Sequence, residues 1–481
     1  MTRISSAALS AALTLPLLLG ATGAATGATQ AGGQPPATGA DFQRSVLTTG
    51  LSDPFEVLFG PGRRLWVTER TAGRVTAVNP TTGTKHTLLK IPSVVSTKGL
   101  PDGVVITENE QDGLLGMALH RSGGHLNVYL SYTYDGDPGP GLKRRQRIVS
   151  YQYAPASDTL VHPSTLIEGL LASDDHNSGR IKIGRDGKLY YTIGDRGNNQ
   201  DLNACRRNQA LRLPTRAEVR TKNWVAYQGK TLRMNLDGSI PADNPVIAGV
   251  RSHVWTYGHR NAQGLVIAPD GRVYSSEQGP KSDDELNLLR AGGNYGWPRI
   301  AGYQDGDYVY GNWSARESGC DPADYNAFVI PADVPQFSEF SYHAPNLVPP
   351  LRSFYAVPPD YDFRLNTQRC APLAFICYPT VAPSNLDLYT KRTIPGWHNS
   401  FLMTTLKTGA LFVMPRVTPT QVDGPFRLFR SVNRYRDTAV SPDGRTIYIA
   451  TDSAGLAADL NGRATDKLDN PGAILAFHYT G

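Results

Sequence analysis

FEVLFGPGRRLWVTE (residues 55–69) and DTAVSPDGRTIYIAT (residues 437–451) follow one pattern near opposite ends of the chain. Each segment alternates apolar and polar residues, turns at a glycine and resumes with aromatic or β-branched residues, which is typical of a β-hairpin. The same pattern recurs at residues 114–132, 179–195, 264–278 and 401–415. Six hairpins at irregular intervals longer than a four-stranded blade predict an all-β fold, a six-bladed β-propeller with long inserted loops. A β-sandwich or a pair of β domains is the alternative.

The composition agrees with a β-rich globular protein. The 481 residues include 48 Gly and 35 Pro, while 40% are hydrophobic and 19% are charged. A disordered chain would have fewer apolar residues and a larger net charge. Helical signals are scarce: residues 214–219 could begin a short helix, and residues 282–290 mix the periods of helix and strand.

The net charge of +6 is small for this length. The densest basic cluster contains Lys143, Arg144, Arg145 and Arg147 and follows a Gly/Pro-rich stretch. Because the sequence has no recognisable nucleic-acid-binding module, we expect an exposed loop here and no nucleic-acid partner.

The N-terminal residues predict export. Residues 1–28 combine an early Arg3, a short apolar run and then small residues, which is the layout of a secretory signal peptide. We expect residues 29–44 to form a flexible segment and residues 45–481 to form a single propeller domain. The apolar run is too short to span a bilayer, and no later stretch is long enough, so we expect a periplasmic or secreted protein without a membrane span.

The four cysteines are disulfide candidates in an exported protein. The sequence spacing favours a bond between Cys370 and Cys377, and leaves Cys205 and Cys320 either to pair or to remain free.

Two segments that precede expected strands carry groups suited to catalysis. In DDHNSGR (174–180), His176 beside Asp175 is either a tuned base or an ordinary loop histidine. In GHRNAQGL (258–265), Arg260 and Asn261 offer hydrogen-bond donors to an anionic or carbonyl oxygen, although such pairs are common in loops.

Two further segments suggest ion binding. EQGPKSDDELN (277–287) offers carbonyl and carboxylate oxygens that suit calcium, although it lacks the spacing of an EF-hand and could be a solvated acidic turn. In NRYRD (433–437), Arg434 and Arg436 share one face of an extended segment, and Lys407 could approach them. Three such cations predict an anion such as a polycarboxylate; a surface charge cluster is the alternative.

Taken in order, these segments resemble the soluble pyrroloquinoline quinone (PQQ)-dependent glucose dehydrogenase family, whose members include glucose/sorbosone dehydrogenase-like propellers. The resemblance runs from about Ser45 to the C-terminus. Its motifs include LWVTERTAGRV, QDGLLG, DHNSGRIKIG, YYTIGD, GHRNAQGL, SEQGPKSDDELNL, GGNYGWP, CYPTVAPS, LKTGALF and NRYRDTAVSPDG. The family is a six-bladed propeller, which agrees with the hairpin pattern.

The resemblance implies a role for each matching residue. His176 matches the general base, and Asp175 matches the carboxylate that orients it. Arg260 and Asn261 match donors to the quinone carbonyls, with Arg260 also counted among the catalytic residues. The remaining residues that match contacts to PQQ are Lys407, Arg434, Arg436 and Thr380.

The resemblance also implies calcium. Gly279 and Pro280 match the carbonyls that hold a calcium ion against the cofactor. A second group of ligands matches sites that support loops and a homodimer: Asp284, Glu285 and Tyr295 in one site, and Ala301, Tyr303, Asp305 and Glu339 in another.

The expected substrate pocket departs from the family pattern. Gln111, Asp175 and Gln200 match sugar contacts. An apolar family residue is replaced by Asp201, and a Tyr/Trp pair is replaced by Phe375 and Tyr378. The resemblance therefore implies oxidation of an aldose at C1 to the lactone, with an altered sugar preference and an unidentified electron acceptor. A calcium-dependent lactonase-like propeller and a non-catalytic propeller that binds a glycan or protein are the alternatives.

Overall fold

The structure is a computed structural model that describes residues 36–96, 111–137, 139–366, 370 and 374–481. The expected signal peptide, residues 1–28, lies outside these residues. Within them, no helix is long and apolar enough to cross a membrane.

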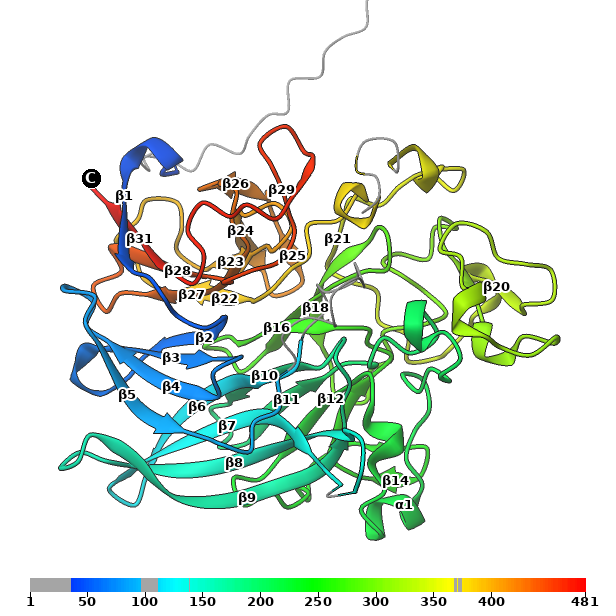
Figure 1. Ribbon diagram of the computed structural model, residues 1–481, viewed down its shortest axis with the longest axis horizontal. Helices are drawn as coiled ribbons and strands as arrows, with labels where there is room; N and C mark the ends of the chain where they lie inside the picture. Colours follow the sequence, from blue (N-terminus) through cyan, green and yellow to red (C-terminus); the bar gives the residue numbers. More distant parts are fainter. Residues whose placement is uncertain (1–35, 97–110, 138, 367–369, 371–373) are drawn as a thin grey trace, which may run out of the picture. The chain divides into compact units, whose positions relative to one another are not determined.

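Six antiparallel sheets dominate the described part of the chain (Figure 1). The first three consist of β2 (Pro54–Phe59), β3 (Leu65–Glu69), β4 (Arg74–Val78) and β5 (Lys85–Lys90); β6 (Leu114–Ser122), β7 (His125–Asp135), β8 (Arg144–Ala154) and β9 (Thr159–Leu171); and β10 (Ser178–Ile183), β11 (Leu189–Ile193), β12 (Lys230–Met234) and β15 (Val254–Tyr257).

The other three sheets have the same four-stranded plan. They consist of β16 (Ala262–Ile267), β17 (Val273–Glu277), β18 (Asp284–Leu289) and β21 (Arg352–Phe354); β22 (Asp387–Tyr389), β23 (Ser400–Thr404), β24 (Leu411–Thr418) and β26 (Phe426–Leu428), with β25 (Gln421–Val422) added; and β27 (Tyr435–Val440), β28 (Thr446–Thr451), β31 (Ile474–Tyr479) and β1 (Phe42–Thr48).

Short elements fill the loops between these strands. The small strands are β13 (Val246–Ile247), β14 (Val250–Arg251), β19 (Val309–Gly311), β20 (Gln336–Ser338), β29 (Ala457–Ala458) and β30 (Ala464–Thr465). The helix α1 (Arg216–Arg220) lies where the sequence predicts a short helix. The 3-10 turns are η1 (Gly39–Asp41), η2 (Pro61–Arg63), η3 (Asp201–Asn203), η4 (Trp224–Tyr227), η5 (Trp313–Ala315), η6 (Pro322–Asp324), η7 (Glu339–Ser341), η8 (Phe363–Asn366) and η9 (Ala374–Cys377).

This arrangement confirms the predicted six-bladed propeller. Each of the six predicted hairpins falls in a different sheet. Five of them join the first two strands of a sheet, whereas the hairpin around Gly409 joins β23 to β24, the second and third strands. The ambiguous stretch 282–290 forms a strand, β18, because it pairs with both β17 and β21.

The last sheet is completed by the first strand of the chain. β1 pairs antiparallel with β31, and Phe42 lies opposite Tyr479. The expected flexible segment 29–44 therefore includes three residues of a strand, because residues 42–44 bond to the C-terminal strand. β1 therefore covers the edge of β31 and becomes the outer strand of the last sheet.

The hydrophobic core lies between neighbouring sheets. Ile181 and Leu232 of the third sheet pack with Ile148 and Ile167 of the second. Comparable clusters of buried side chains join each sheet to the next around the ring. This packing follows from strands that carry apolar side chains on both faces.

One buried arginine ties the first strands of several sheets together. Arg180 of β10 is only 1% exposed, and it donates to the carbonyls of Phe55, Gln263 and Ser384 at 3.2, 3.0 and 2.8 Å. It also pairs with Glu56 at 2.7 Å and lies 3.4 Å from Asp437. These partners come from β2, β16, β27 and the segment before β22, so one side chain links five sheets.

Two disulfides fasten the inserted loops. Cys370 bonds to Cys377, which is the pair that the spacing favours. Cys205 bonds to Cys320 across 115 residues, which joins the loop after η3 to the long insertion between β18 and β21.

Candidate active site

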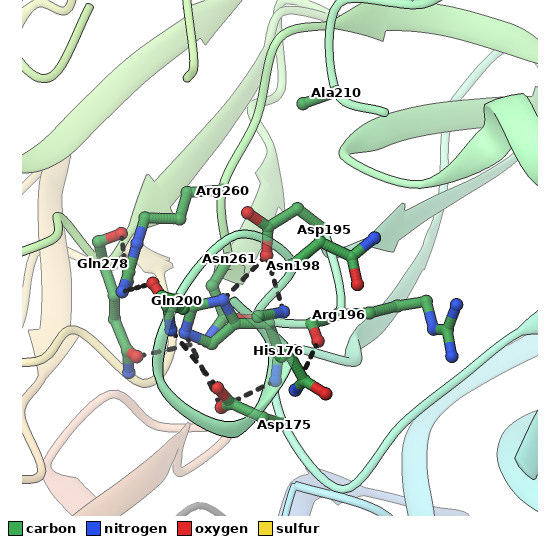
Figure 2. Close-up of polar contacts among 12 residues, drawn as sticks. Asp175, His176, Asp195, Arg196, Asn198, Gln200, Ala210, Arg260, Asn261 and Gln278 are labelled. Carbon is green, nitrogen blue, oxygen red and sulfur yellow. Dashed lines mark hydrogen bonds and ion pairs between the residues drawn. The ribbon is translucent and has the colours of Figure 1, made fainter. Parts of the chain in front are cut away.

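His176 lies in the turn that precedes β10, with a left-handed φ of 44° and a nearly buried ring. Its Nδ1 lies 2.8 Å from Oδ1 of Asp195, the second residue after β11 (Figure 2). An ionised carboxylate can only accept a hydrogen bond, so this contact places the ring proton on Nδ1. Nε2 is then the basic nitrogen, as a general base requires.

The carboxylate that contacts the His176 ring at hydrogen-bond distance is Asp195, whereas the family resemblance implies that Asp175 orients the ring. The Asp175 carboxylate lies 3.6 Å from Nε2, which is too long for a hydrogen bond. Asp195 belongs to the quoted motif YYTIGD, and the signal available in the sequence was a carboxylate at the end of an apolar strand.

Asp195 is held by a complete set of donors. Its carboxylate accepts from Trp297 Nε1 at 2.7 Å, Asn208 Nδ2 at 2.9 Å and the Gly197 amide at 2.9 Å. Burial favours the protonated form, but His176, the charge of Arg260 and the hydrogen bond from Trp297 together lower the pKa of Asp195. The group is thus an anion that fixes the imidazole.

Asp175 instead contacts the expected sugar-binding glutamines. Its Oδ1 accepts from Gln111 Nε2 at 2.9 Å and from the His176 amide at 2.9 Å, while Oδ2 lies 3.4 Å from Gln200 Nε2. Burial raises the pKa of Asp175. The structure therefore brings His176, Asp175, Gln111 and Gln200 together, as the sequence predicts.

Arg260 and Asn261 complete this group from the turn before β16. Arg260 donates to Gln200 Oε1 at 3.0 Å and to the Gln278 carbonyl at 3.2 Å, whereas its buried Nε has no partner in the structure. Asn261 Nδ2 donates to Gln111 Oε1 at 2.9 Å and to Gln278 Oε1 at 3.1 Å. Figure 2 shows these side chains converging on the His176 ring.

Gln263 was not singled out in the sequence, and it links this group to the expected cofactor cations. Its Nε2 donates to Gln111 Oε1 at 2.8 Å, and its Oε1 accepts from Arg436 at 3.3 Å. Arg434 and Arg436 converge as predicted, but they converge on Asp452, to which both bind. The sequence reasoning missed this counter-ion, which compensates one of their two charges.

Among the described residues, Lys407 has no hydrogen-bonded carboxylate. Its buried ammonium donates to the Tyr378 carbonyl and to Thr380 Oγ1, the latter at 2.7 Å. Burial lowers the pKa of Lys407 to about 7, while the more distant charge of Asp284 opposes this effect. A buried cation whose hydrogen-bond partners are neutral oxygens is a suitable partner for an anionic ligand.

The donor set fits PQQ, a planar tricarboxylate with quinone oxygens. Positive charge for the PQQ carboxylates comes from Lys407, Arg434 and Arg436. Thr380 lies beside Lys407. Arg260, with its unpartnered Nε, and Asn261 supply donors for carbonyl oxygens.

Asp284 and Glu285 do not share a site through their carboxylates. They are consecutive in β18, so their side chains point to opposite faces of the sheet. Asp284 accepts from the amides of Gly279 and Ala382, both at 2.9 Å, whereas Glu285 accepts from Gly302 at 2.8 Å. The Tyr295 hydroxyl donates to the Leu288 carbonyl at 2.6 Å. Asp284 thus braces the Gly279–Pro280 turn.

Two of the other expected calcium ligands, Asp305 and Glu339, do gather. Asp305, Asp307 and Glu339 each direct an oxygen to one region, with these atoms within 4.8 Å of one another. Glu339 accepts from the Ala301 amide at 3.1 Å. Tyr303 lies in the same loop, between Ala301 and Asp305. Burial raises the pKa of Asp307 to about 8 and that of Glu339 to about 7. Asp307 was not predicted, because only the fold places it beside Asp305 and Glu339.

The expected substrate-pocket residues lie around η3 and η9. Phe375 is 40% exposed, while Tyr378 is half-buried and contacts Phe363 and Phe328. Burial, together with the nearby charge of Asp201, raises the pKa of Tyr378 to about 12.

Comparison with known proteins identifies the relatives of this chain. The glucose/sorbosone dehydrogenase family model matches residues 51–333 and 366–458. Quinoprotein glucose dehydrogenase B of Acinetobacter calcoaceticus is 42% identical over 450 residues, which is 91% of each chain. Aldose sugar dehydrogenase YliI of Escherichia coli is 31% identical over 209 residues, covering 42% of this chain and 49% of the relative.

Solved structures share the fold. The PQQ-bound aldose sugar dehydrogenase of Streptomyces coelicolor superimposes with a TM-score of 0.58 at 24% identity, covering 92% of this chain and 99% of the other. The apo-form of the Escherichia coli aldose sugar dehydrogenase gives a TM-score of 0.58 at 22% identity, covering 91% and 99%.

Proposed function

Since the chain belongs to the glucose/sorbosone dehydrogenase family, we propose that it is a quinoprotein that oxidises the C1 hydroxyl of an aldose to the lactone. One observation carries the proposal: Asp195 holds His176 with Nε2 as its basic nitrogen, beside the carboxamides of Gln111 and Gln200. A base at this position removes the proton of the anomeric hydroxyl.

Bound PQQ supplies the acceptor for the hydride that leaves C1. The chain contributes the groups that hold it: Lys407, Arg434 and Arg436 for the carboxylates, and Arg260 and Asn261 for the quinone oxygens, where donors stabilise negative charge. His176 Nε2 takes the hydroxyl proton, and Asp195 stabilises the imidazolium that forms. Gln111, Asp175 and Gln200 orient the sugar hydroxyls.

We propose calcium at two places. The Gly279 and Pro280 carbonyls would hold one ion near the cofactor, where it would act as a Lewis acid. The carboxylates of Asp305, Asp307 and Glu339 would hold another, since calcium prefers several hard oxygen ligands.

The two disulfides support our proposal that the protein is periplasmic or secreted, because disulfides persist in oxidising compartments. Mass spectrometry of the mature N-terminus from the native host would test the expected signal peptide at residues 1–28. An N-terminus at Met1 would contradict export by cleavage.

The decisive experiment titrates EDTA-treated protein with PQQ and Ca²⁺ and follows dye reduction with glucose, maltose and xylose. We expect activity that requires both additions, and a sugar ranking that reflects Asp201, Phe375 and Tyr378. If no PQQ binds and no aldose is oxidised, the proposal fails. Lactone hydrolysis would then distinguish the lactonase-like propeller from a non-catalytic one.

A further inference from the structure

Three arginines lie together at the edge of the candidate active site, and we call Arg145, Arg196 and Arg206 the basic rim. Arg196 Nε donates to the Ala172 carbonyl at 3.0 Å. The preceding residue, Leu171 of β9, pairs with Arg145 of β8. The Arg196 carbonyl accepts from Asn203 Nδ2 at 3.3 Å, and the Asn203 carbonyl accepts from the Arg206 amide at 2.9 Å. The backbone therefore fixes all three residues as neighbours.

Among the described residues, no carboxylate pairs directly with this rim. In the part of the chain that the structure describes, Arg145, Arg196 and Arg206 form no ion pair, whereas the nearby Lys143, Arg144 and Arg147 pair with Asp137, Asp112 and Glu168. Burial, followed by the charges of Arg206 and Arg145, lowers the pKa of Arg196 to about 10, although Asp174 and Asp195 oppose this shift. The three cations thus repel one another.

The rim adjoins the catalytic group but faces away from it. The Arg196 amide lies 3.4 Å from the His176 carbonyl, and Figure 2 shows the guanidinium of Arg196 directed away from the imidazole. Arg206 is exposed. Leu202 of η3, which is 59% exposed, lies between Arg196 and Arg206 in the sequence, and Leu142, which is 45% exposed, precedes Arg145 by three residues. Arginine is among the residues that are enriched at protein–protein interfaces.

We propose that the basic rim docks an acidic one-electron carrier protein that reoxidises the enzyme. The inference rests on the proposed function, because oxidation of the sugar removes two electrons that must leave the site. One aldose and two oxidised carriers would give one lactone, two reduced carriers and two protons. Charge complementarity favours a carrier with an acidic face, and a small charged contact suits a partner that must dissociate after each electron.

The test compares the holoenzyme with the Arg145→Glu/Arg206→Glu variant, in which Arg196 is kept because it adjoins Asp195. The probe is a purified acidic c-type cytochrome with glucose as the reductant, and a neutral phenazine dye is the parallel acceptor. We expect cytochrome reduction at low ionic strength to fall ~10- to 100-fold, within the range that electrostatic steering covers, while dye reduction is unchanged. The difference should shrink at about 1 M salt, where the Debye length is about 3 Å.

Arg121→Glu/Arg427→Glu is the matched control, since it makes the same change in net charge at exposed positions on β6 and β26. Equal slowing in the control, or wild-type cytochrome reduction by the rim variant, would overturn the inference. A basic c-type cytochrome should not be slowed by the rim variant. Absence of dye reduction in every protein would instead refute the proposed function.

Discussion

At the residue scale, the Asp195–Nδ1 hydrogen bond determines which nitrogen of His176 can act as a base. Asp195→Asn would offer the ring an amide in place of an anion and would lose the charge that stabilises the imidazolium. We expect turnover to fall by a factor of roughly 10² to 10⁴, the usual worth of a general base, with PQQ affinity nearly unchanged. Steady-state kinetics and a PQQ titration would measure both quantities.

The matched control is Asp174→Asn, which removes a carboxylate two residues before His176 without altering any hydrogen bond to the ring. It should retain most of the turnover. A wild-type rate in Asp195→Asn would mean that this carboxylate does not position the base.

Lys407 gives a pH-dependent prediction. Because burial lowers its pKa to about 7, the folded apo-protein binds fewer protons than the unfolded chain between about pH 7 and its ordinary value of 10.5. The lysine therefore destabilises the apo-fold near pH 7 and below, and this penalty disappears as the pH rises. An anionic cofactor would favour the ammonium, so PQQ binding at pH 8.5 should take up a proton.

Calorimetry in two buffers of different ionisation enthalpy would measure this uptake. Lys407→Met is the control, and it should bind PQQ more weakly without the additional proton. Identical proton uptake in the two proteins would remove Lys407 from the cofactor site.

The sequence predicted the donors of this site better than their counter-ions. His176, Arg260 and Lys407 stand in distinctive motifs beside other polar groups, whereas Asp195 is the last residue of the apolar motif YYTIGD and Asp452 lies outside the quoted motifs. Only the fold brings Asp195 to His176 and Asp452 to the two arginines. The resemblance implies that Asp175 orients His176, but in the structure the ring hydrogen bond is made by Asp195 and Asp175 contacts Gln111.

At the scale of elements, Arg180 joins β10 to the first strands of other sheets. Arg180→Met would leave the buried Glu56 and Asp437 carboxylates without their main cation and should lower the free energy of unfolding by about 3 to 5 kcal/mol. The double variant Arg180→Met/Glu56→Gln should recover part of this loss. Equilibrium urea unfolding would measure both; a loss below about 1 kcal/mol in the single variant would contradict the role.

The loop that carries Asp305 and Asp307 should respond to calcium. Asp307→Asn removes one of three crowded carboxylates, so the variant should be at least as stable as the wild type in EDTA. With calcium the wild type should be the more stable protein. Calcium binding raises its free energy of unfolding by RT ln(1 + [Ca²⁺]/Kd), which is about 2.7 kcal/mol at a calcium concentration of one hundred times Kd. Thermal unfolding under both conditions would test this; parallel shifts in the two proteins would exclude Asp307 as a ligand.

The strands were more predictable than the loops between them. A hairpin is determined by the alternation of apolar residues within one short segment, so all six hairpins could be located from the sequence. The insertion between β18 and β21 has no such period, because a disulfide and buried contacts such as Trp313 with Val334 maintain it. The placement of Asp307 beside Glu339 depends on this insertion and could not be inferred from spacing.

At the scale of the whole described domain, β1 closes the ring by pairing with β31, and its Phe42 side chain packs into an aromatic cluster. The Phe42 ring lies 5.3 Å from Trp397, 5.0 Å from Phe429 and 5.5 Å from Tyr479, whereas Val46 of the same strand is 45% exposed. Phe42→Ala should lower the free energy of unfolding by roughly 2 to 4 kcal/mol, and the control Val46→Ala by less than about 0.5 kcal/mol. Urea unfolding that showed equal effects would contradict this closure.

The pairing of β1 with β31 also makes the polypeptide almost cyclic. Since Phe42 lies opposite Tyr479, a short peptide could join the two strands as an ordinary hairpin turn. New ends could then be opened at the exposed turn between β13 and β14, around Gly249, which lies outside the six main sheets. Such a circular permutant would keep every blade intact, and it would allow a reporter domain to be attached at a position that the natural ends cannot reach.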